Sequence, residues 1–510
     1  MRVAYVYSEH GGTGEGGGGD LSAPTESFTL AEAAAHLNRI DASWVQGPDG
    51  MPILGSPTTV TYAFRSTEPA MGDAFSRFNA NQIAAANLAL QSWSDVANIT
   101  FTRVTGEGPG GAYSNNASIL FSNQDAEPGA AWGAYAQPPY TANRSAGSNQ
   151  GDVHVNSDIA ANLNPQLFEY GLGTLTHELG HAIGFHHPGD YDAGQGPISY
   201  NNSAEFIEDT KQYTIMSYWS ETNTGADFND ADPSAPQIID IAAAQRLYGA
   251  NLSFNTGDTT YGFNANAGRP WYVATADQTP IFSAWDAGGE DTFDFSGYAV
   301  KQTIDLRNGF FSSVGGYKFN VSVSGAVKVD GETVNTIENA VGGSAVDTII
   351  GNKADNALDG RNGNDTLQAG KGDDLLLGGD GNDLLVASKG LDTLNGGLGQ
   401  DLMTGQKHND RFVFQSLSDS MVGAEDRIYG GLTRLDVIDL SGIDADTTTG
   451  GNQAFHLGGA SFDGDAGELI RFYHAGSNTT FIQGDVDGDN DADFSIAVTG
   501  DFSSHPSFVL

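Results

Sequence analysis

The chain has 510 residues, and its 64 acidic residues against 22 basic ones give a formal net charge of −42. A chain with this charge is not expected to bind nucleic acid or an anionic membrane through bulk electrostatics. The expected ionic partner is a cation, and calcium is the first candidate because hard oxygen ligands suit it. Cysteine is absent, which excludes disulfide bonds and a thiol nucleophile, and the 68 glycines indicate β structure rich in turns.

The N-terminal segment, residues 1–50, carries few signals of stable structure. Residues 1–8 lack the basic region and apolar core of a conventional signal peptide, so the chain is expected either to stay in the cytosol or to use another export route. Residues 1–50, with the glycine-rich run at 11–20, predict a flexible lead-in, with a removable pro-segment that covers a site as the alternative. Residues 29–38 predict one short helix. No stretch approaches the length of a membrane span, so no membrane insertion is expected.

From about residue 55 to residue 250 the sequence shows the mixed pattern of a compact domain. Alternating apolar and polar residues predict strands, and apolar residues at helical spacing predict helices. The expected strands are 58–65, 99–104 and 117–121, and the expected helices are 79–97, 169–182 and 238–248. No βαβ rhythm is evident, which favours an α+β fold.

The strongest local signal is the sequence THELGHAIGFHHP. Its residues His177, Glu178, His181, Gly184 and His187 match the pattern H-E-x-x-H-x-x-G-x-x-H. His177 and His181 are four residues apart, so they share one face of a helix and can bind one ion. Gly184 lets the chain turn back and bring in His187 as a third nitrogen ligand. Three imidazoles with one open position indicate a catalytic zinc site, and a helix with surface histidines is the alternative.

Met216 and Tyr218, which follow the histidine motif in the sequence, fit the same site. Met216 lies in the sequence TIMSY, the Met-turn that accompanies the extended histidine motif, and it is expected to form a hydrophobic floor under the metal. Tyr218 follows closely, and its phenol can reach the metal or an oxyanion. His186 adjoins His187 but falls outside the motif spacing, so it is expected in the cleft wall or at the surface.

From residue 342 the sequence repeats every nine residues, with an acid or amide at the sixth position and an apolar residue at the eighth. The sixth positions are Asp347, Asn356, Asp365, Asp374, Asp383, Asp392, Asp401 and Asp410. The eighth positions are Ile349, Leu358, Leu367, Leu376, Leu385, Leu394, Met403 and Phe412. This is the G-G-x-G-x-D-x-U-x nonapeptide of calcium-binding parallel β-rolls, in which glycines allow tight turns and apolar residues stack inward. Without calcium the aspartates repel one another, so ion binding is expected to be coupled to folding.

The last hundred residues return to strand-like alternation, for example at 411–414 and 495–498. Residues 485–493, DVDGDNDAD, resemble the start of an oxygen-rich calcium loop but lack the rest of an EF-hand. A calcium loop and a solvated acidic turn are therefore both kept as interpretations of this segment.

The sequences HELGHAIGFHHPGDYDAG, YTIMSYWSETNTG and DIAAAQRLYGANLS carry a family resemblance, which extends back to SWSDVANITF and forward through WDAGGEDTFDFSGY into the repeats. On these residues the chain resembles the serralysin family of secreted bacterial metzincin zinc endopeptidases, over roughly residues 55–415 with a looser match to the end. The resemblance implies a metzincin-like α+β protease domain at 51–250, followed at 251–510 by an all-β parallel β-roll and a C-terminal secretion region.

The resemblance implies one catalytic zinc ion, held by His177, His181 and His187, with Glu178 as the general base. Tyr218 would be a further zinc ligand in the resting state that moves aside to stabilise the tetrahedral intermediate. A short segment resembles the edge strand that pairs with extended substrates, and backbone pairing explains broad specificity because it does not read side chains. The residues of that segment are Ala130, Ala131, Trp132, Gly133, Ala134 and Tyr135.

The resemblance also implies several structural calcium ions. The first ion at the domain junction would be bound by Asn255, Gly257, Thr259, Asp286, Gly288 and Asp291, and the second by Gly289, Asp291, Thr336 and Glu338. Asn255 stands where the family has a basic residue, which a carbonyl ligand tolerates. In the roll, carbonyls at the second and fourth positions would join the carboxylate at the sixth. The ligands implied there are Gly343, Ala345, Asp347, Arg361, Gly363, Asp365, Gly370, Gly372, Asp374, Gly379, Gly381 and Asp383.

The predicted function is that of a secreted, calcium-stabilised zinc endopeptidase that hydrolyses peptide bonds of extracellular proteins with broad specificity. The resemblance implies a monomer whose partners are protein substrates and a type I exporter, which reads an uncleaved C-terminal signal. Ser507 departs from that signal, because the family has an acid before its last three apolar residues. Two alternatives are a calcium-dependent adhesin or surface protein with a vestigial metal site, and another exported enzyme such as a lipase, for which no G-x-S-x-G motif is found.

Overall fold

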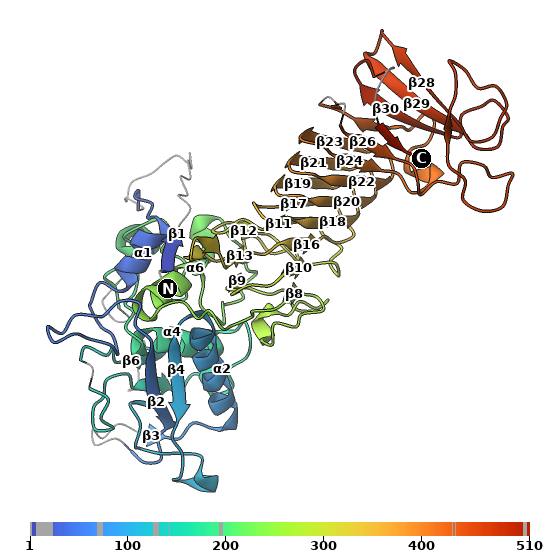
Figure 1. Ribbon diagram of the computed structural model, residues 1–510. Helices are drawn as coiled ribbons and strands as arrows, with labels where there is room; N and C mark the ends of the chain where they lie inside the picture. The colour runs from blue at the N-terminus through green and yellow to red at the C-terminus, as the bar shows by residue number, and fades with distance from the viewer. Residues whose placement is uncertain are drawn as a thin grey trace.

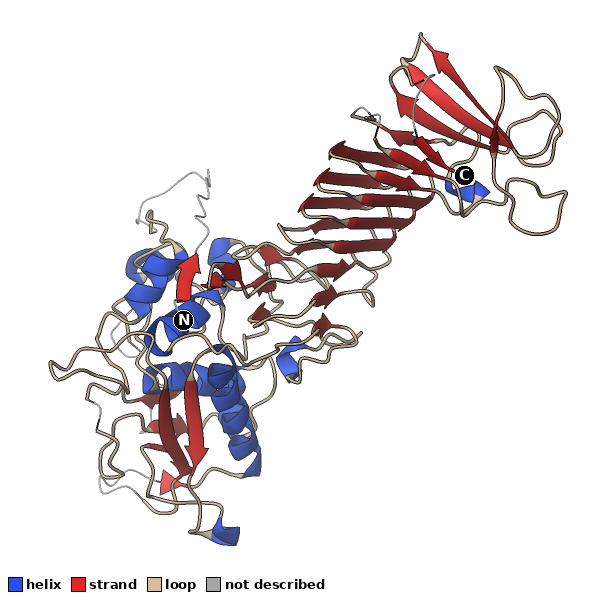
Figure 2. Cartoon of the chain, viewed as in Figure 1, coloured by secondary structure: helices blue, strands red, loops and turns tan. Residues whose placement is uncertain are grey.

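The computed structural model describes residues 3–6, 24–68, 75–125, 132–141, 143–192, 197–430, 432–433, 435–502 and 507–510. The N-terminal part is rounded and holds most of the helices, and the C-terminal part is an elongated stack of strands (Figures 1 and 2). The C-terminus lies at the end of the stack that is far from the helices (Figure 1). Among the described residues, no helix is both long and apolar enough to cross a membrane.

The N-terminal part contains a twisted sheet with the order β4–β2–β5–β7–β6, and β3 pairs with β5. Its strands are β2 (Thr58–Phe64), β3 (Phe75–Ser76), β4 (Ile99–Arg103), β5 (Ile119–Gln124), β6 (Ala134–Ala136) and β7 (Val153–Asn156). The three strands expected at 58–65, 99–104 and 117–121 are confirmed. Strands β2, β4, β5 and β7 are parallel, whereas β3 and β6 are antiparallel to their neighbours.

The helices of this part are α1 (Leu30–Leu37), α2 (Ala80–Val96), α3 (Ala160–Leu163), α4 (Tyr170–Ala182), α5 (Tyr200–Ser203) and α6 (Ile238–Tyr248). The longer ones pack on one another, and α2 and α4 also contact strands of the sheet. The helices expected at 79–97, 169–182 and 238–248 are confirmed as α2, α4 and α6. Strand β2, helix α2 and strand β4 form a βαβ unit, because parallel neighbours need a crossover connection. The expectation that the domain has no βαβ unit was therefore wrong for this one crossover. The α+β class is unchanged, because the unit is not repeated.

The N-terminal segment is folded onto this domain from α1 onward, which corrects the expectation of a flexible lead-in for residues 30–50. Thr29 and Glu32 form a capping box at the start of α1, which confirms the expected helix at 29–38. Ala33, Ala34 and Leu37 are buried in the domain core, where α1 packs against α6. Trp44 is also buried, and its indole N–H donates to the carbonyl of Ala182 at the end of α4 at 2.9 Å. Residues 11–20 lie outside the described residues.

The elongated part is a roll in which the chain alternates between two parallel sheets. The central strands of one sheet are β16 (Asn339–Val341), β18 (Ala357–Asn362), β20 (Leu375–Asp380), β22 (Thr393–Leu398), β24 (Arg411–Val413) and β26 (Val437–Asp439). Those of the other are β11 (Gln302–Asp305), β17 (Asp347–Ile350), β19 (Thr366–Lys371), β21 (Leu384–Lys389), β23 (Leu402–Lys407) and β25 (Asp426–Ile428). The expected parallel β-roll is thus observed.

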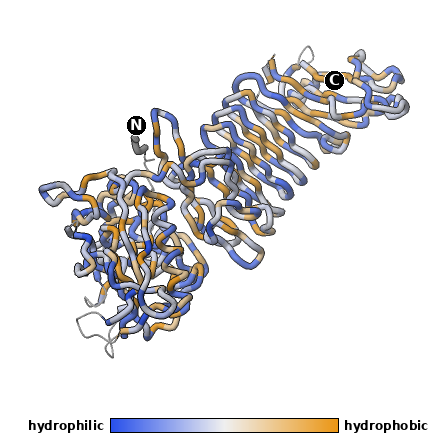
Figure 3. The backbone as a smooth tube through the Cα atoms, turned by 60° about the horizontal axis from the view of Figure 1, so that its bottom comes forward, coloured by the Kyte–Doolittle hydropathy of each residue, from blue (hydrophilic) through white to orange (hydrophobic). Residues whose placement is uncertain are grey.

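The nonapeptide pattern explains the stacking. The eighth-position residues pair in register, Leu358 with Leu376 and Leu367 with Leu385, so one apolar column runs inside each sheet. All eight of these side chains are at most 1% exposed. Figure 3 shows the apolar segments in line along the roll. The result is a thin core that is built by addition of coils rather than by contacts distant in sequence.

Shorter strands complete the two ends of the roll. At the end next to the N-terminal part lie β8 (Thr260–Gly262), β9 (Phe282–Ala284), β10 (Thr292–Asp294), β12 (Phe311–Ser312), β13 (Val321–Val323), β14 (Ala326–Val329) and β15 (Glu332–Thr333), and β1 (Val3–Val6) pairs with β14. At the far end lie β27 (His456–Leu457), β28 (Glu468–His474), β29 (Thr479–Asp485), β30 (Phe494–Thr499) and β31 (Ser507–Val509). Strands β24 and β30 confirm the alternation expected at 411–414 and 495–498.

Candidate metal centre and active-site cleft

Helix α4 presents His177, Glu178 and His181, and the turn that follows it brings in His187. The helix ends at Ala182, and Gly184 has a φ of +113°, in the region that side chains disfavour. A Cβ atom on Gly184 would also lie 2.3 Å from the carbonyl oxygen of Ala42. Both facts require glycine at this turn, and the turn sends the chain back toward the helix face that carries the two histidines.

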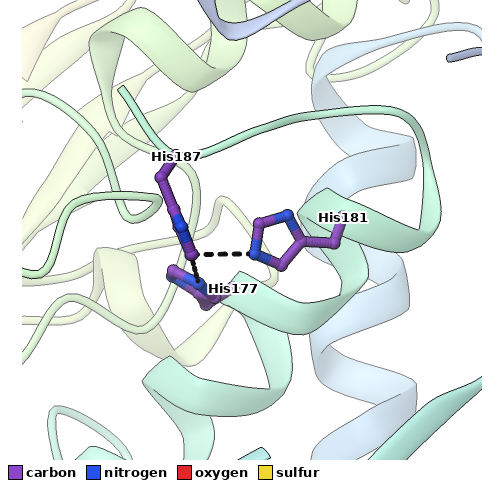
Figure 4. Close-up of side chains that lie close together, drawn as sticks. All are labelled: His177, His181 and His187. Atoms are coloured by element: carbon purple, nitrogen blue, oxygen red, sulfur yellow. Dashed lines mark hydrogen bonds between the residues drawn. The ribbon is translucent and has the colours of Figure 1, made fainter. Parts of the chain in front are cut away.

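The three imidazoles converge on one point (Figure 4). The Nε2 atom of His187 lies 3.2 Å from that of His177 and 3.1 Å from that of His181. The Nδ1 atoms point away and each meets a backbone carbonyl oxygen: Ile215 for His177 at 2.8 Å, Phe185 for His181 at 2.8 Å, and Tyr191 for His187 at 2.7 Å.

This arrangement fits a bound metal ion. A carbonyl oxygen only accepts, so each Nδ1 atom carries the proton and each Nε2 atom of a neutral ring presents a bare lone pair. Three lone pairs so close repel one another unless a cation lies among them. Burial, together with the neighbouring His187, lowers the pKa of His177 to about 3 and that of His181 well below its usual range, so the rings of His177 and His181 are held in the neutral form that binds metal. Three nitrogen ligands with an open side are the set that catalytic zinc prefers.

Glu178 lies beside this point, and its carboxylate can still accept a hydrogen bond. The residue is only 5% exposed, and its Oε2 atom has no hydrogen-bond partner among the described residues. Burial raises the pKa of Glu178 to about 8. A carboxyl group whose pKa is near neutrality can both take up and release a proton at working pH.

The Met-turn lies directly below the histidines. Met216 is fully buried, and a Cβ atom on Gly180 would come within 2.3 Å of its sulfur, so the glycine allows the turn to pack against α4. The buried carboxylate of Asp240 holds the turn: Thr214 Oγ1 and the N–H of Ile215 both donate to it, the latter at 2.7 Å. The carbonyl of Ile215 in turn accepts from His177.

Tyr218 stands at the rim of the centre and is 37% exposed. Its ring centroid lies 4.4 Å from that of His187 and 5.8 Å from that of His177. The structure therefore brings Tyr218 to the histidines. His186 lies outside the group, because its Nδ1 atom faces the guanidinium of Arg39 at 3.1 Å.

A cleft of about 380 Å³ opens next to Glu178 and His177. Its walls come from the first turns of α4, the Met-turn, the start of β6, and a Lys211–Asp232 ion pair. Sequence analysis missed this ion pair, since the two residues carry no motif. It also missed the buried Asp240. The place of this acid in the first turn of α6 suggested only a helix cap, not a contact with the Met-turn.

Part of the segment expected to pair with substrate lies at the edge of the sheet, beside the cleft. Strand β6 is the last strand of the sheet and pairs only with β7 on one side, so its other edge faces the cleft. Gly133 and Ala134 line the cleft, whereas the hydroxyl of Tyr135 donates to Gln124 on the sheet at 2.9 Å. Trp132 packs edge-on against the ring of Tyr135. Ala130 and Ala131 lie outside the described residues.

In the roll, the sixth-position carboxylates form two ladders between successive coils. The N–H of Asp365 donates to Asp383 Oδ1, and the N–H of Asp383 donates to Asp401 Oδ1, both at 2.7 Å and 18 residues apart. In most of these carboxylates the other oxygen has no hydrogen-bond partner among the described residues, whereas Asp347 Oδ2 accepts from the N–H of Gly343. Buried Oδ2 atoms without a partner are found at Asp365, Asp374, Asp383, Asp392, Asp401 and Asp426. Burial and neighbouring carboxylates raise the pKa of Asp365, Asp374 and Asp383 to about 7.

These orphaned oxygens fit a hard cation in the turns. A Cβ atom on Gly363 would meet the carbonyl oxygen of Ala345 at 2.5 Å and Asp365 Oδ1 at 2.7 Å, so backbone carbonyls and carboxylates are close there. The remaining expected ligands occupy the same turns: Gly343, whose N–H donates to Asp347, and Arg361, Gly370, Gly372, Gly379 and Gly381, all five with positive φ.

Two further aspartates continue the ladders beyond the regular repeats. The N–H of Asp401 donates to Asp426 Oδ1 at 2.8 Å, and that of Asp410 donates to Asp436 Oδ1 at 3.0 Å. Sequence analysis missed both because an inserted loop separates them from the nine-residue period. Burial, together with Asp401 and Asp419, raises the pKa of Asp426 to about 9.

The acids expected at the domain junction also come together. Asp291 accepts from the N–H of Thr259 at 2.8 Å, its own N–H donates to Glu338 at 2.9 Å, and its Oδ2 atom is buried without a partner. Burial first, then the charge of Asp286, raises the pKa of Asp291 to about 9.

The other residues expected at the junction surround these acids. The N–H of Gly288 donates to Asp286, the Gly257 carbonyl accepts from the hydroxyl of Thr259, and Gly289 packs against Gly257. Asn255 has a φ of +49° and donates to Tyr261, and Thr336 is half-buried two residues before Glu338.

The acidic segment at 485–493 stays open to both interpretations. Carboxylate oxygens of Asp485, Asp487 and Asp493 lie within 4.8 Å of one another. The N–H groups of Asp487, Gly488 and Asn490 donate to Asp485, which a solvated acidic turn would also show.

Comparisons with known proteins cover nearly the whole chain. Residues 55–211 match the matrixin family, and residues 250–510 match the family described as Peptidase M10 serralysin C terminal. Serralysin C of Dickeya chrysanthemi is 42% identical over 489 residues, which is 95% of this chain and 91% of the relative. Metallopeptidase AprA of Pseudomonas marginalis is 43% identical over 480 residues, 93% and 90% of the two chains. Serralysin of Proteus mirabilis is 42% identical over 496 residues, 95% and 93% of the two chains.

Proposed function

The chain belongs to the serralysin family and is a zinc metalloendopeptidase, and on that premise we propose that His177, His181 and His187 hold the zinc ion and that Glu178 is the general base. The observation that carries this proposal is the convergence of three Nε2 atoms at 3.1–3.2 Å while every Nδ1 atom is bound to a carbonyl. An adhesin with a vestigial metal site would not need this fixed orientation of all three rings.

Zinc, when bound, supplies a Lewis acid that polarises the scissile carbonyl and makes water acidic at neutral pH. Glu178 takes a proton from the attacking water through its unpartnered oxygen and passes it to the leaving amine. The hydroxyl of Tyr218, at the rim beside His187, donates a hydrogen bond to the oxyanion that develops on the carbonyl. Met216 keeps the floor of the centre dry and rigid.

The substrate would bind as an extended strand along the free edge of β6, with residues 132–135 as its backbone partner. Pairing of this kind fixes the direction and depth of the peptide without selecting its side chains. Protein substrates of many sequences would therefore be cleaved, and selectivity would come from the cleft beside Glu178.

Calcium ions would bind in the turns of the roll and at the junction with the protease domain. The support is the series of buried carboxylate oxygens without partners at Asp365, Asp383 and Asp291 in a chain of strongly negative charge. Asp426 and Asp436 would extend the series. The ions would neutralise these oxygens and so make folding of the roll favourable.

The relatives support a secreted enzyme, and for this chain we propose export by a type I exporter that reads the C-terminal end, and action as a monomer. We propose a division into an N-terminal segment at 1–50, a protease domain at 51–250 and a roll with the secretion region at 251–510. In this division, a removable pro-segment would end before α1, because α1 is part of the domain core.

Casein hydrolysis by the purified protein in calcium-containing buffer tests the proposed function. Activity should vanish when 1,10-phenanthroline removes zinc and should return when zinc is restored. A protein that binds zinc, is folded with calcium and still shows no activity would be a latent form or a binding protein, and the N-terminal sequence of the sample would separate these two.

A further inference from the structure

The third imidazole of the metal centre depends on a loop, not on a helix. His177 and His181 are fixed by α4, but His187 lies in the segment that follows the turn at Gly184. Because a metal site needs its ligands within a fraction of an ångström of their positions, something must hold the backbone of this segment. The bond from His187 Nδ1 to the carbonyl of Tyr191 orients the ring, but it lies within the segment and does not anchor it to the domain. Farther along the segment, Tyr191 donates to Asp209 at 2.8 Å.

The anchor next to His187 itself comes from the N-terminal segment. Arg39, just after α1, donates from one guanidinium nitrogen to the carbonyl of His187 at 2.6 Å and from the other to the carbonyl of Gly189 at 3.1 Å. The same guanidinium donates to the carbonyl of His36 at 3.1 Å, which ties it to its own helix. A further backbone bond, from the N–H of His186 to the carbonyl of Leu37 at 2.9 Å, joins the two segments.

The chemistry of this contact is suited to positioning. The planar guanidinium bridges two carbonyl oxygens of one loop, which a point charge such as an ammonium group cannot do with the same geometry. The group is half-buried and His187 is 4% exposed, so these charge-assisted bonds are sheltered from water. The contact acts on the backbone on both sides of Pro188, immediately beside the metal-binding side chain.

We propose that Arg39 is a positioning residue that holds the His187–Gly189 loop so that the third imidazole is presented to the zinc ion. This inference rests on the proposed function, since it assumes that His187 binds zinc. It gives Arg39 a role at the metal centre, although this residue precedes the protease motifs by more than a hundred residues in the sequence.

Zinc release from the full-length, calcium-loaded protein to a chromogenic chelator tests the inference. For Arg39→Ala we expect release at least about tenfold faster than wild type, because outer-shell partners of metal ligands typically contribute 10–100-fold to metal affinity. Arg39→Lys should fall between the two, because it keeps the charge but cannot bridge both carbonyls. With cobalt in place of zinc, the visible spectrum of Arg39→Ala should change in shape, which a general loss of stability would not cause.

Arg144→Ala is the matched control. Arg144 also donates to backbone carbonyls of the N-terminal part, at Trp44 at 2.8 Å and at Thr59, but it does not contact the His187 loop. It should lower the melting temperature and leave zinc release and the cobalt spectrum as in wild type. If Arg39→Ala does not fold, Arg39→Lys carries the comparison.

Wild-type release of zinc and an unchanged cobalt spectrum in a folded Arg39→Ala or Arg39→Lys protein would overturn the inference. Equal acceleration in the Arg39 and Arg144 variants would also overturn it, since the effect would then reflect overall stability. A wild-type protein that holds no zinc would instead contradict the proposed function itself.

Discussion

The proposed zinc centre and the proposed calcium sites of the roll would bind metal ions in opposite ways. In the protease domain each histidine is locked by a hydrogen bond from Nδ1 to a carbonyl, and Met216 and Asp240 brace the site from below. In the roll the ligating oxygens of aspartates such as Asp365 and Asp383 are buried and unpaired. Packing and bonds to backbone carbonyls therefore orient the ligands of the first site, whereas the ligands of the second are carboxylates that repel one another.

The difference follows from how much core surrounds each site. The protease domain has a wide core of aromatic and aliphatic side chains, from Trp93 to Phe185 and Tyr248. The repeats of the roll bury only one large apolar side chain per nonapeptide, which gives a thin core. A thin core supplies less hydrophobic stabilisation per residue, so the roll is the region whose folding should require the ion.

Removal of calcium should produce the largest effect and should separate the two regions. After transfer to EGTA with zinc restored, amides of β19–β21 should lose hydrogen-exchange protection, because uncompensated carboxylates oppose folding. Amides of α2 and α4 should stay protected. Protection that persists in the roll without calcium would contradict the comparison, and so would simultaneous loss in both regions.

Substitution of the general base should abolish turnover without disturbing either metal. Glu178→Gln should lower kcat by about 10³-fold, within the range that general-base catalysis contributes. Zinc content and melting temperature should match wild type, because the carboxylate braces none of the histidines. The control is Glu169→Gln at the start of the same helix, which should retain full activity. Substantial turnover in zinc-loaded Glu178→Gln would refute the assigned role.

A cavity made in the core of the roll should lower the stability of that region markedly, because its core is thin. Leu376 is fully buried, so Leu376→Ala should lower the stability of the calcium-loaded roll by about 2–5 kcal/mol, as for other buried leucines. Leu391→Ala is the control, since Leu391 is 56% exposed and its loss should change little. Urea unfolding monitored by far-UV circular dichroism would measure both. Equal effects of the two substitutions would show that the eighth-position column is not the core of the roll.

The smallest expected effect is on how the stability of the roll depends on pH, which should have opposite signs with and without calcium. In the calcium-free roll, burial raises the pKa of Asp365, Asp374 and Asp383 to about 7, above the value near 3.9 of an unfolded aspartate. The folded form then binds more protons than the unfolded form, so its stability is present near pH 4 and is lost as the pH rises through 7.

With calcium the trend should reverse, because the ion needs ionised carboxylates. Far-UV circular dichroism between pH 4.5 and 8 would measure both series. Asp383→Asn should flatten the calcium-free slope, since it removes one of the titrating groups. A calcium-free roll that is more ordered at pH 8 than at pH 4.5 would contradict this reasoning.

Much of the fold and most of the metal centre could be predicted from the sequence, because both are local patterns. The spacing from His177 to His187 encodes a helix and a glycine turn, and the nonapeptide encodes one coil per two repeats. Residues that act through distant contacts carried no such pattern: Arg39 reaches the His187 loop across the fold, and Asp426 rejoins the ladder after an insertion. The alanine-rich face of α1 became meaningful only when α6 was seen to pack against it.

The hydrogen-bond ladder between aspartates 18 residues apart sets a unit of length for the protein. Two nonapeptides make one full coil and return the chain to the same sheet. Gain or loss of 18 residues therefore lengthens or shortens the molecule by one coil and leaves every later strand in its own sheet. A change of nine residues would exchange the two sheets for everything downstream, including the strands at the C-terminal end. The distance between the catalytic domain and that end can thus vary only in whole coils.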